Sequence, residues 1–233
     1  KNIYINQKIV LNTNIVDEIL EKKPKVIHKK INDICKVGLI NGLYATSAGT
    51  GGITIIEAYK TFHETKLALV ITGQQGNVMK ESIQCAKTIA WNLLPHSIKK
   101  NTIKDLEKQV WGLHVHCPEA SVPKDGPSAG AAITLALVSL FTNIPVRNDV
   151  ALTGEIDLNG DILVIGGLEY KIEGGKKAGV TTICYPEGNA QDIEIVKNTN
   201  PEVLENINLI KVKNIFQVLE ICLEPHELKF TRF

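Results

Sequence analysis

PKDGPSAG, residues 123–130, runs directly into the apolar segment AAITLALVSL of residues 131–140. The uninterrupted apolar run predicts a buried helix over residues 128–141, because a helix that is hydrophobic on all sides belongs in a core. Pro127 suits the first turn of such a helix, since its φ is fixed near the helical value and its missing N–H is not needed there. Gly126 allows a tight turn just before it. The pattern therefore predicts that Ser128 begins a buried helix.

The hydroxyl of Ser128 has two interpretations at such a position. Serine is a preferred N-cap residue, and helix caps are far more numerous than catalytic serines. A helix N-terminus also offers unpaired N–H groups and the positive end of the helix dipole, which can stabilise an oxyanion during acyl transfer. Taken alone, the stretch favours the cap, and a second segment of the chain reverses that preference.

The second segment is ALTGEIDLNGDILVIGGLEYKIEGGKKAGV, residues 151–180, which contains Lys171. Together the two segments resemble the proteolytic domain of Lon, the ATP-dependent AAA+ serine protease. The resemblance covers all of PKDGPSAG and, in the second segment, TGE (153–155), GGL (166–168), Lys171 and the Ala178-Gly179 pair. A looser similarity runs from about Val37 through GQQGNVMKES (73–82) and HVHCPE (114–119) to the last helix.

The resemblance implies a catalytic dyad in which Ser128 is the nucleophile and Lys171 the general base and later the general acid. A serine hydroxyl is a poor nucleophile until a base removes its proton. A lysine with the ordinary pKa near 10.4 is protonated at neutral pH, so it serves as a base only where burial disfavours the ammonium. Taken alone, a lysine in the first turn of a helix is more often solvated. The apolar strand and Gly-Gly turn before Lys171 allow its stem to be covered, and the resemblance favours a buried position.

Supporting roles are predicted for four further residues. The resemblance implies that Thr153 lies beside the dyad and accepts a hydrogen bond from the lysine, although threonine is also common in strands. Asp125 is expected to anchor its loop or to pair with a cation. The Asp125–Gly126 turn, together with the Ser128 amide, is expected to form the oxyanion hole. His116 is the fourth candidate.

His114 and His116 alternate on one strand and therefore point to the same face. A metal site with the adjacent Cys117 is conceivable, but Cys117 faces the other way and no further ligands cluster nearby in the sequence. We therefore predict a packing or loop-supporting role for the histidines. A Ser-His-Asp triad is a further alternative. The lysine of the resemblance argues against it, and His116 is the next candidate base.

The composition is that of a globular domain. The chain has 233 residues, of which 44% are hydrophobic, enough for one large domain or one domain with an appendage. Lys and Arg number 26 against 25 Asp and Glu, so nucleic acid is not an expected partner. No apolar run is as long as a membrane span, and we recognise no signal or transit peptide. The five cysteines lack paired spacing and are interpreted as small buried hydrophobes in a reducing compartment.

The alternation of strand and helix patterns predicts a mixed α/β (α+β) fold, a single compact Lon-type domain with mixed sheets and flanking helices. We expect strands over residues 51–58, 66–73, 111–117, 150–156, 180–186 and 207–212, and helices over 77–94, 128–141, after 189, and 214–223. Residues 37–233 are expected to form this domain. Residues 1–36 are interpreted as a linker or a remnant of a preceding ATPase domain, with a helical pattern over residues 14–23. The start at Lys1 suggests a piece of a longer protein.

The expected function is that of the Lon proteolytic domain, hydrolysis of peptide bonds in unfolded or damaged proteins. GGKKAG (174–179) lacks the spacing of a P-loop, so ATP and Mg²⁺ are expected in an ATPase domain outside this chain, with no cofactor or metal in the domain itself. The resemblance implies polypeptide substrates, the protein's own ATPase domain and a homo-hexamer, without a membrane. The expected compartment is the mitochondrial matrix, with the bacterial cytoplasm as the alternative. The alternative function is a non-catalytic Lon-like scaffold or oligomerisation module.

Three departures from the family pattern concern the surroundings of the dyad. Tyr170 stands where glutamate is usual, GLYATSAG (42–49) replaces a GLAWT pattern near the expected substrate groove, and Glu173-Gly174-Gly175 replaces an alanine-rich run. The second bears on substrate preference and not on the dyad. The third predicts a weakened helix.

Overall fold

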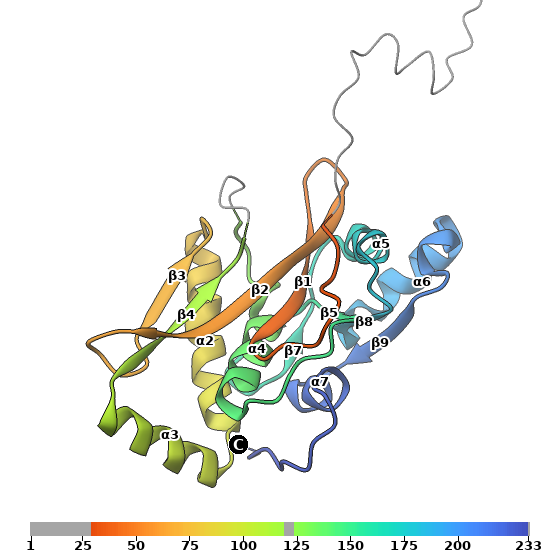
Figure 1. Cartoon of the computed structure of the whole chain (residues 1–233). Helices are drawn as coiled ribbons and strands as arrows, with labels where there is room; N and C mark the ends of the chain where they lie inside the picture. Colours follow the sequence, from red (N-terminus) through yellow and green to blue (C-terminus); the bar gives the residue numbers. More distant parts are fainter. Residues whose placement is uncertain (1–28, 119–123, 233) are drawn as a thin grey trace, which may run out of the picture.

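The computed structural model describes residues 29–118 and 124–232, and the predicted helical pattern over residues 14–23 lies outside them. A seven-stranded mixed sheet with the strand order β3-β4-β2-β1-β5-β8-β9 forms the centre of the molecule (Figure 1). The strands of this sheet are β1 (Leu39–Ala45), β2 (Gly51–Phe62), β3 (Leu69–Thr72), β4 (Trp111–His116), β5 (Val150–Leu152), β8 (Thr182–Pro186) and β9 (Asn208–Val212). A second, two-stranded sheet pairs β6 (Glu155–Ile156) with β7 (Ile162–Leu163).

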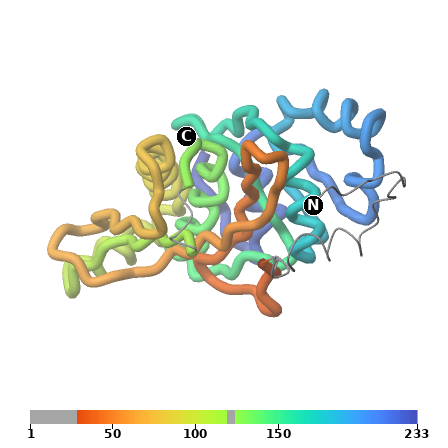
Figure 2. Tube along the Cα trace, turned by 90° about the horizontal axis from the view of Figure 1, so that it is seen from above, coloured from red at the N-terminus to blue at the C-terminus, as the bar shows by residue number. Residues whose placement is uncertain are grey.

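The sheet combines an antiparallel half with a parallel half. β2 pairs antiparallel with both β1 and β4, whereas β1, β5, β8 and β9 run parallel to one another, as do β3 and β4. The helices are α2 (Asn77–Leu93), α3 (His96–Lys108), α4 (Gly130–Thr142), α5 (Leu168–Ala178), α6 (Ala190–Thr199) and α7 (Ile215–Cys222), with short 3-10 turns at Glu187–Asn189 and Pro201–Leu204. Figure 2 shows the β3–β4 end of the sheet opposite to α6. The mixed α/β domain predicted from the sequence is confirmed.

Alternating side chains of β2 enter two different hydrophobic clusters, as expected for a strand with helices on both faces. Ile56 and Ala58 pack with α2, α4 and α7, whereas Ile53 and Ile55 pack with α5 and α6. Every residue from Gly130 to Ser139 is buried, which explains why the α4 segment is apolar on all sides. The two helix layers therefore approach the sheet from opposite sides.

The predicted start of the central helix is wrong by two residues. Helix α4 begins at Gly130, and Ser128 lies in the turn before it. A helical Ser128 would offer its carbonyl to the amide four residues later. This carbonyl instead accepts hydrogen bonds from Gly154 N at 2.8 Å and Thr153 Oγ1 at 3.3 Å. Contact with a distant segment therefore takes Ser128 out of the helix, and its side chain is not an N-cap.

Several other elements differ from the sequence-based expectation. Strand β2 extends to Phe62, four residues beyond the expected end, because its second half pairs with β4 across residues Glu57–Phe62. Strand β1, helix α3 and strand β7 have no counterpart in the prediction, and the single strand predicted over residues 150–156 is wrong, because β5 and β6 belong to different sheets. Residues 30–36, at the end of the predicted linker, bond to the domain: Ile31 N donates to Ala178 O at 3.1 Å, and Lys36 pairs with Val146.

Candidate active site

The loop that carries Ser128 joins two structural layers. The Ser128 carbonyl is bonded to the segment after β5, as described above. In the first turn of α4, Ala131 N donates a hydrogen bond to Gly154 O at 3.1 Å. Pro127 O accepts a hydrogen bond from Gly130 N at 3.0 Å, which closes the turn around Ser128. Gly126 has a φ of 117°, a backbone conformation that favours glycine. Ser128 is thus held between the end of β5 and the start of α4.

Lys171 is brought to the same place by a close approach of α5 to β2. A Cβ built at Gly174 would lie 2.2 Å from Gly52 N, and one built at Gly51 would lie 1.9 Å from Tyr170 O. Only glycine permits two backbones to come this near. The glycines that weaken the helix in isolation therefore allow it to lie directly against the strand. Lys171 is consequently only 4% exposed.

Thr153 connects Lys171 to the serine loop. Lys171 Nζ donates a hydrogen bond to Thr153 Oγ1 at 3.1 Å, and that hydroxyl donates to Ser128 O at 3.3 Å. Thr153 is fully buried, so water does not compete for these bonds. Within the described part of the chain, no hydrogen bond joins Ser128 Oγ directly to Lys171 Nζ. The structure brings the three residues together through the threonine.

Burial sets the protonation behaviour of Lys171. Desolvation disfavours the ammonium and lowers the pKa of Lys171 from 10.5 to about 8. Among the described residues, no Asp or Glu forms an ion pair with it. About a tenth of the Lys171 side chains are therefore neutral amines at pH 7, and about half at pH 8, and the neutral amine is the form that can accept a proton.

Asp125 anchors its loop, the first of its two predicted roles. Its Oδ1 accepts hydrogen bonds from Met79 N at 3.0 Å and from Gly126 N at 2.9 Å. The carboxylate thus satisfies an N–H group in the first turn of α2, where negative charge is favoured by the helix dipole. Because the Gly126 amide is bonded to Asp125, it is not available to an oxyanion, whereas the Ser128 amide stays a candidate from the predicted oxyanion hole.

The histidine pair makes its contacts with a neighbouring strand. Thr72 Oγ1 lies 2.8 Å from His114 Nε2 and 2.7 Å from His116 Nδ1, so both rings face one hydroxyl of β3. Cys117 is fully buried, and burial raises the pKa of its thiol to about 11. In the described ranges, His, Cys, Asp and Glu side chains form no group of three or more that could hold a metal ion.

Two tyrosines that depart from the family pattern are partly exposed. Tyr44 and Tyr170 are 41% and 38% exposed. The Tyr44 hydroxyl lies beside Gly52, and the Tyr170 ring lies beside Gly49.

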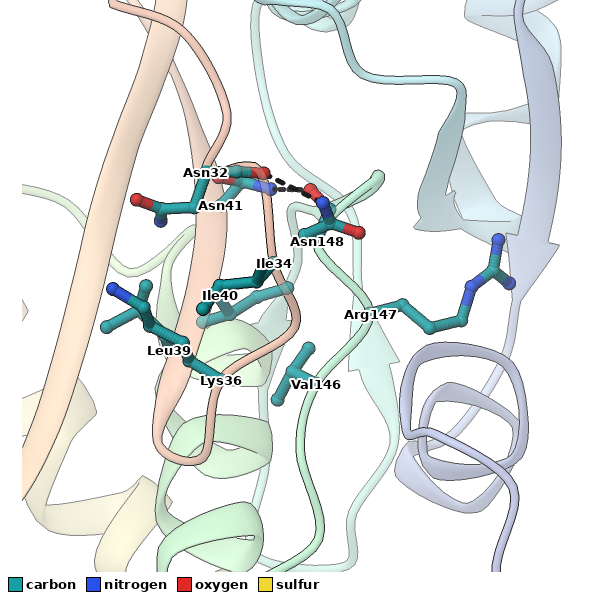
Figure 3. Close-up of a pocket in the computed structure, with 9 residues that line it drawn as sticks. All are labelled: Asn32, Ile34, Lys36, Leu39, Ile40, Asn41, Val146, Arg147 and Asn148. Atoms are coloured by element: carbon teal, nitrogen blue, oxygen red, sulfur yellow. Dashed lines mark hydrogen bonds between the residues drawn. The ribbon is translucent and has the colours of Figure 1, made fainter.

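The pocket in Figure 3 is a separate feature, lined by Asn32, Ile34, Lys36, Leu39, Ile40, Asn41, Val146, Arg147 and Asn148. Its polar side is closed by hydrogen bonds from Asn41 Nδ2 to Asn148 O and from Asn148 Nδ2 to Asn32 O, at 2.9 and 2.8 Å. Neither Ser128 nor Lys171 lines it.

Comparison with known proteins matches the amino-acid sequence of this chain to a family. The family model for the Lon protease (S16) C-terminal proteolytic domain matches residues 10–225. The chain belongs to this family. Among its relatives, a Lon protease homolog of Acanthamoeba polyphaga mimivirus is 43% identical over 230 residues, which is 97% of this chain and 22% of that protein. The Lon protease of Campylobacter jejuni is 39% identical over 223 residues, or 93% of this chain and 27% of that protein.

The Lon protease of Orientia tsutsugamushi is 37% identical over 219 residues, which cover 94% of this chain and 26% of that protein. The chain therefore spans about a quarter of the length of these curated relatives. Among the described residues of this Lon domain, no helix is long and apolar enough to cross a membrane.

Two residues of this Lon domain contact the serine loop although the sequence analysis assigned them no role. Ser82 Oγ donates a hydrogen bond to Pro127 O at 3.3 Å, and Gly76 lies directly against the Asp125 carboxylate. Both belong to the GQQGNVMKES segment, so the signal was its similarity to the family pattern. The role itself depends on contacts between segments about 45 residues apart, which local patterns do not reveal.

Proposed function

We propose that this Lon domain hydrolyses peptide bonds with Ser128 as nucleophile and Lys171 as general base. The observation that carries the proposal is the burial of Lys171 at 4% exposure beside Thr153, which itself bonds to the Ser128 carbonyl. A pKa of about 8 places the lysine near the pH at which a general base works best. A lysine that served only as a surface charge would have no reason to be buried without a carboxylate partner.

In the first step, Lys171 Nζ accepts the hydroxyl proton as Ser128 Oγ attacks the carbonyl carbon of the peptide. The tetrahedral intermediate then breaks its C–N bond, and Lys171 returns the proton to the leaving amine, which produces an acyl-enzyme. In the second step, Lys171 accepts a proton from water, the hydroxide oxygen attacks the ester, and the proton returns to Ser128 Oγ as the acid product leaves. The resting structure has no direct hydrogen bond between Ser128 Oγ and Lys171 Nζ among the described residues, and the proposed contact forms when substrate is bound, since catalytic bonds often tighten in the complex.

Thr153 orients the lysine for these transfers. The Thr153 hydroxyl donates its proton to Ser128 O, so its oxygen acts as the acceptor for Lys171 Nζ. A neutral lysine amine has two N–H groups and one lone pair, and committing one N–H to Thr153 limits the directions of that lone pair. The Ser128 amide is proposed to bind the oxyanion, and the Gly126 amide does not take part because it donates to Asp125.

For the longer protein we propose ATP-dependent proteolysis of unfolded or damaged proteins by a homo-hexamer, with the ATPase, ATP and Mg²⁺ in an AAA+ domain outside this chain. The support is family membership and the fraction of about a quarter that the chain covers of its relatives. This domain itself is proposed to use no cofactor and no metal. The named relatives are bacterial or viral, which favours the bacterial cytoplasm over the mitochondrial matrix as the proposed compartment.

The test combines cleavage of a short unstructured peptide with capture of the nucleophile by a fluorophosphonate. The wild-type chain should cleave the peptide slowly without ATP and be labelled at Ser128, and Ser128→Ala should lose both activities. The fold should survive Ser128→Ala, because the side chain caps no helix. Absence of labelling and of Ser128-dependent cleavage in a folded wild-type chain would support the scaffold alternative instead.

A further inference from the structure

The segment before α2 is bonded to the loop that carries Ser128. Gly76 N donates to Lys124 O at 2.8 Å, and Lys124 N donates to Gln74 O at 3.1 Å. These two bonds form a short parallel bridge between Gln75 and Lys124. The start of the serine loop is therefore attached to the backbone that leads into α2.

The first turn of α2 has no cap of its own and takes one from the serine loop. Gly76 is its N-cap residue and has no side chain, and Asp125 Oδ1 accepts a hydrogen bond from Met79 N instead. A Cβ built at Gly76 would lie 2.3 Å from Asp125 Cγ and 2.4 Å from its Oδ2. The φ of Gly76 is −70°, which any residue adopts. The space beside the carboxylate, and not the backbone angle, therefore requires glycine at this position.

One turn further along α2, Ser82 contacts the residue next to the nucleophile. Ser82 Oγ donates to Pro127 O at 3.3 Å and is 8% exposed. A Cβ built at Gly130 would lie 2.7 Å from the same oxygen, so the start of α4 also lies against it. The Ser82 hydroxyl is thus enclosed between the two ends of the turn that contains Ser128.

We propose that Gly76 and Ser82 are positioning residues for Ser128, acting through Asp125 and Pro127. Bonds from Thr153 and Gly154, which follow β5, hold the loop on one side, and these contacts from α2 hold it on the other. Neither residue touches the reacting atoms, so their contribution is to the placement of the nucleophile. Displacement by about 1 Å can lower turnover by about a hundredfold, which makes such contacts measurable. This inference rests on the proposed role of Ser128.

The first experiment compares Ser82→Ala with Thr88→Ala in the full chain. Thr88 is an exposed residue of the same helix whose hydroxyl donates to Gln84 O at 3.1 Å, so the control removes an equivalent group away from the loop. Ser82→Ala should lower kcat about tenfold with KM unchanged, because the nucleophile is misplaced while the substrate contacts remain. Fluorophosphonate labelling of Ser128 should slow by the same factor. Thr88→Ala should change neither rate by more than about twofold.

The second experiment is a double-mutant cycle between Gly76 and Asp125. Gly76→Ala should lower the Tm by at least about 4 °C in the wild-type background, because the new methyl group displaces the carboxylate. In the Asp125→Ala background the same change should shift the Tm by less than about 1 °C, since the obstructing group is gone. Additive shifts in the two backgrounds would overturn the assigned contact.

Hydrogen exchange separates the positioning role from the proposed function. The backbone amides of residues 124–126 and 128–130 should exchange about tenfold faster in Ser82→Ala than in Thr88→Ala, whether or not peptide is cleaved. If cleavage requires Ser128 but Ser82→Ala behaves like Thr88→Ala in kcat and exchange, the positioning role fails alone. If the folded wild-type chain shows no Ser128-dependent cleavage, the proposed function fails and the positioning role fails with it.

Discussion

Replacement of Lys171 by methionine should make the domain more stable at neutral pH and lose that advantage in alkali. In the folded chain burial lowers the pKa of Lys171 from 10.5 to about 8, a difference that corresponds to about 3 kcal/mol of cost for the buried ammonium. Methionine has a similar length and no charge, so Lys171→Met removes this cost. The variant also loses the hydrogen bond to Thr153, at about 1 kcal/mol at every pH. At pH 7 the net gain in unfolding free energy should be about 2 kcal/mol.

The direction of the pH dependence follows from the lowered pKa. Below pH 8 both the folded and the unfolded chain hold the proton, and the folded state carries the full cost. Between pH 8 and 10.5 the unfolded chain still holds a proton that the folded chain has lost, so wild-type stability rises with pH in this window. The advantage of Lys171→Met over wild type should therefore fall by about 2.5 kcal/mol between pH 7 and pH 10.

The measurement is urea denaturation of the wild type and Lys171→Met at several pH values from 7 to 10, analysed as the difference between the two proteins. The difference cancels the other groups that titrate in this range, which both proteins share. Lys80→Met, at an exposed position of α2, is the control for the loss of one positive charge. A difference that stays constant within about 0.5 kcal/mol from pH 7 to 10 would refute the burial of an ionisable Lys171. The general-base role would then lose its physical basis.

Three further outcomes are expected. The kcat/KM for peptide cleavage should rise with pH along a limb centred near pH 8, and Lys171→Arg should be inactive because a guanidinium cannot accept the proton, so an active arginine variant would contradict the mechanism. Thr153→Val should lower kcat by about ten- to a hundredfold, whereas Thr153→Ser should keep most of it, since only the serine retains the oxygen that accepts from Lys171. Gly174→Ala should destabilise the domain in urea denaturation by more than about 2 kcal/mol, because the new Cβ would lie 2.2 Å from the backbone of β2, and this outweighs a gain in helix propensity of about 1 kcal/mol. Gly166→Ala is the control, since a Cβ at that position would have no atom within 4 Å. Equal effects of the two changes would contradict the close packing.

Much of the fold was accessible from local patterns. The apolar run after residue 130 predicted a buried helix, and β-branched segments predicted most strands of the sheet, because the period of the apolar residues reports which sides are covered. Helix α3 was not predicted: only two of its residues, Thr102 and Leu106, are buried, so its apolar pattern is weak. The break between β5 and β6 and the strand β7 were not predicted either, because β6 and β7 are two residues each, too short for a periodic signal of their own.

The sequence by itself determined which side chains are available for chemistry, since a serine in a Gly-Pro-Ser turn and a lysine after a Gly-Gly turn are local features. Only the tertiary structure decided that Ser128 lies outside the helix, because the bond from Gly154 comes from another segment. The tertiary structure also decided that Lys171 is buried, since its burial depends on glycines of β2 and α5 whose backbones lie directly against each other. Desolvation is a property of everything that surrounds a group in space, and most of those atoms belong to residues far away in the chain.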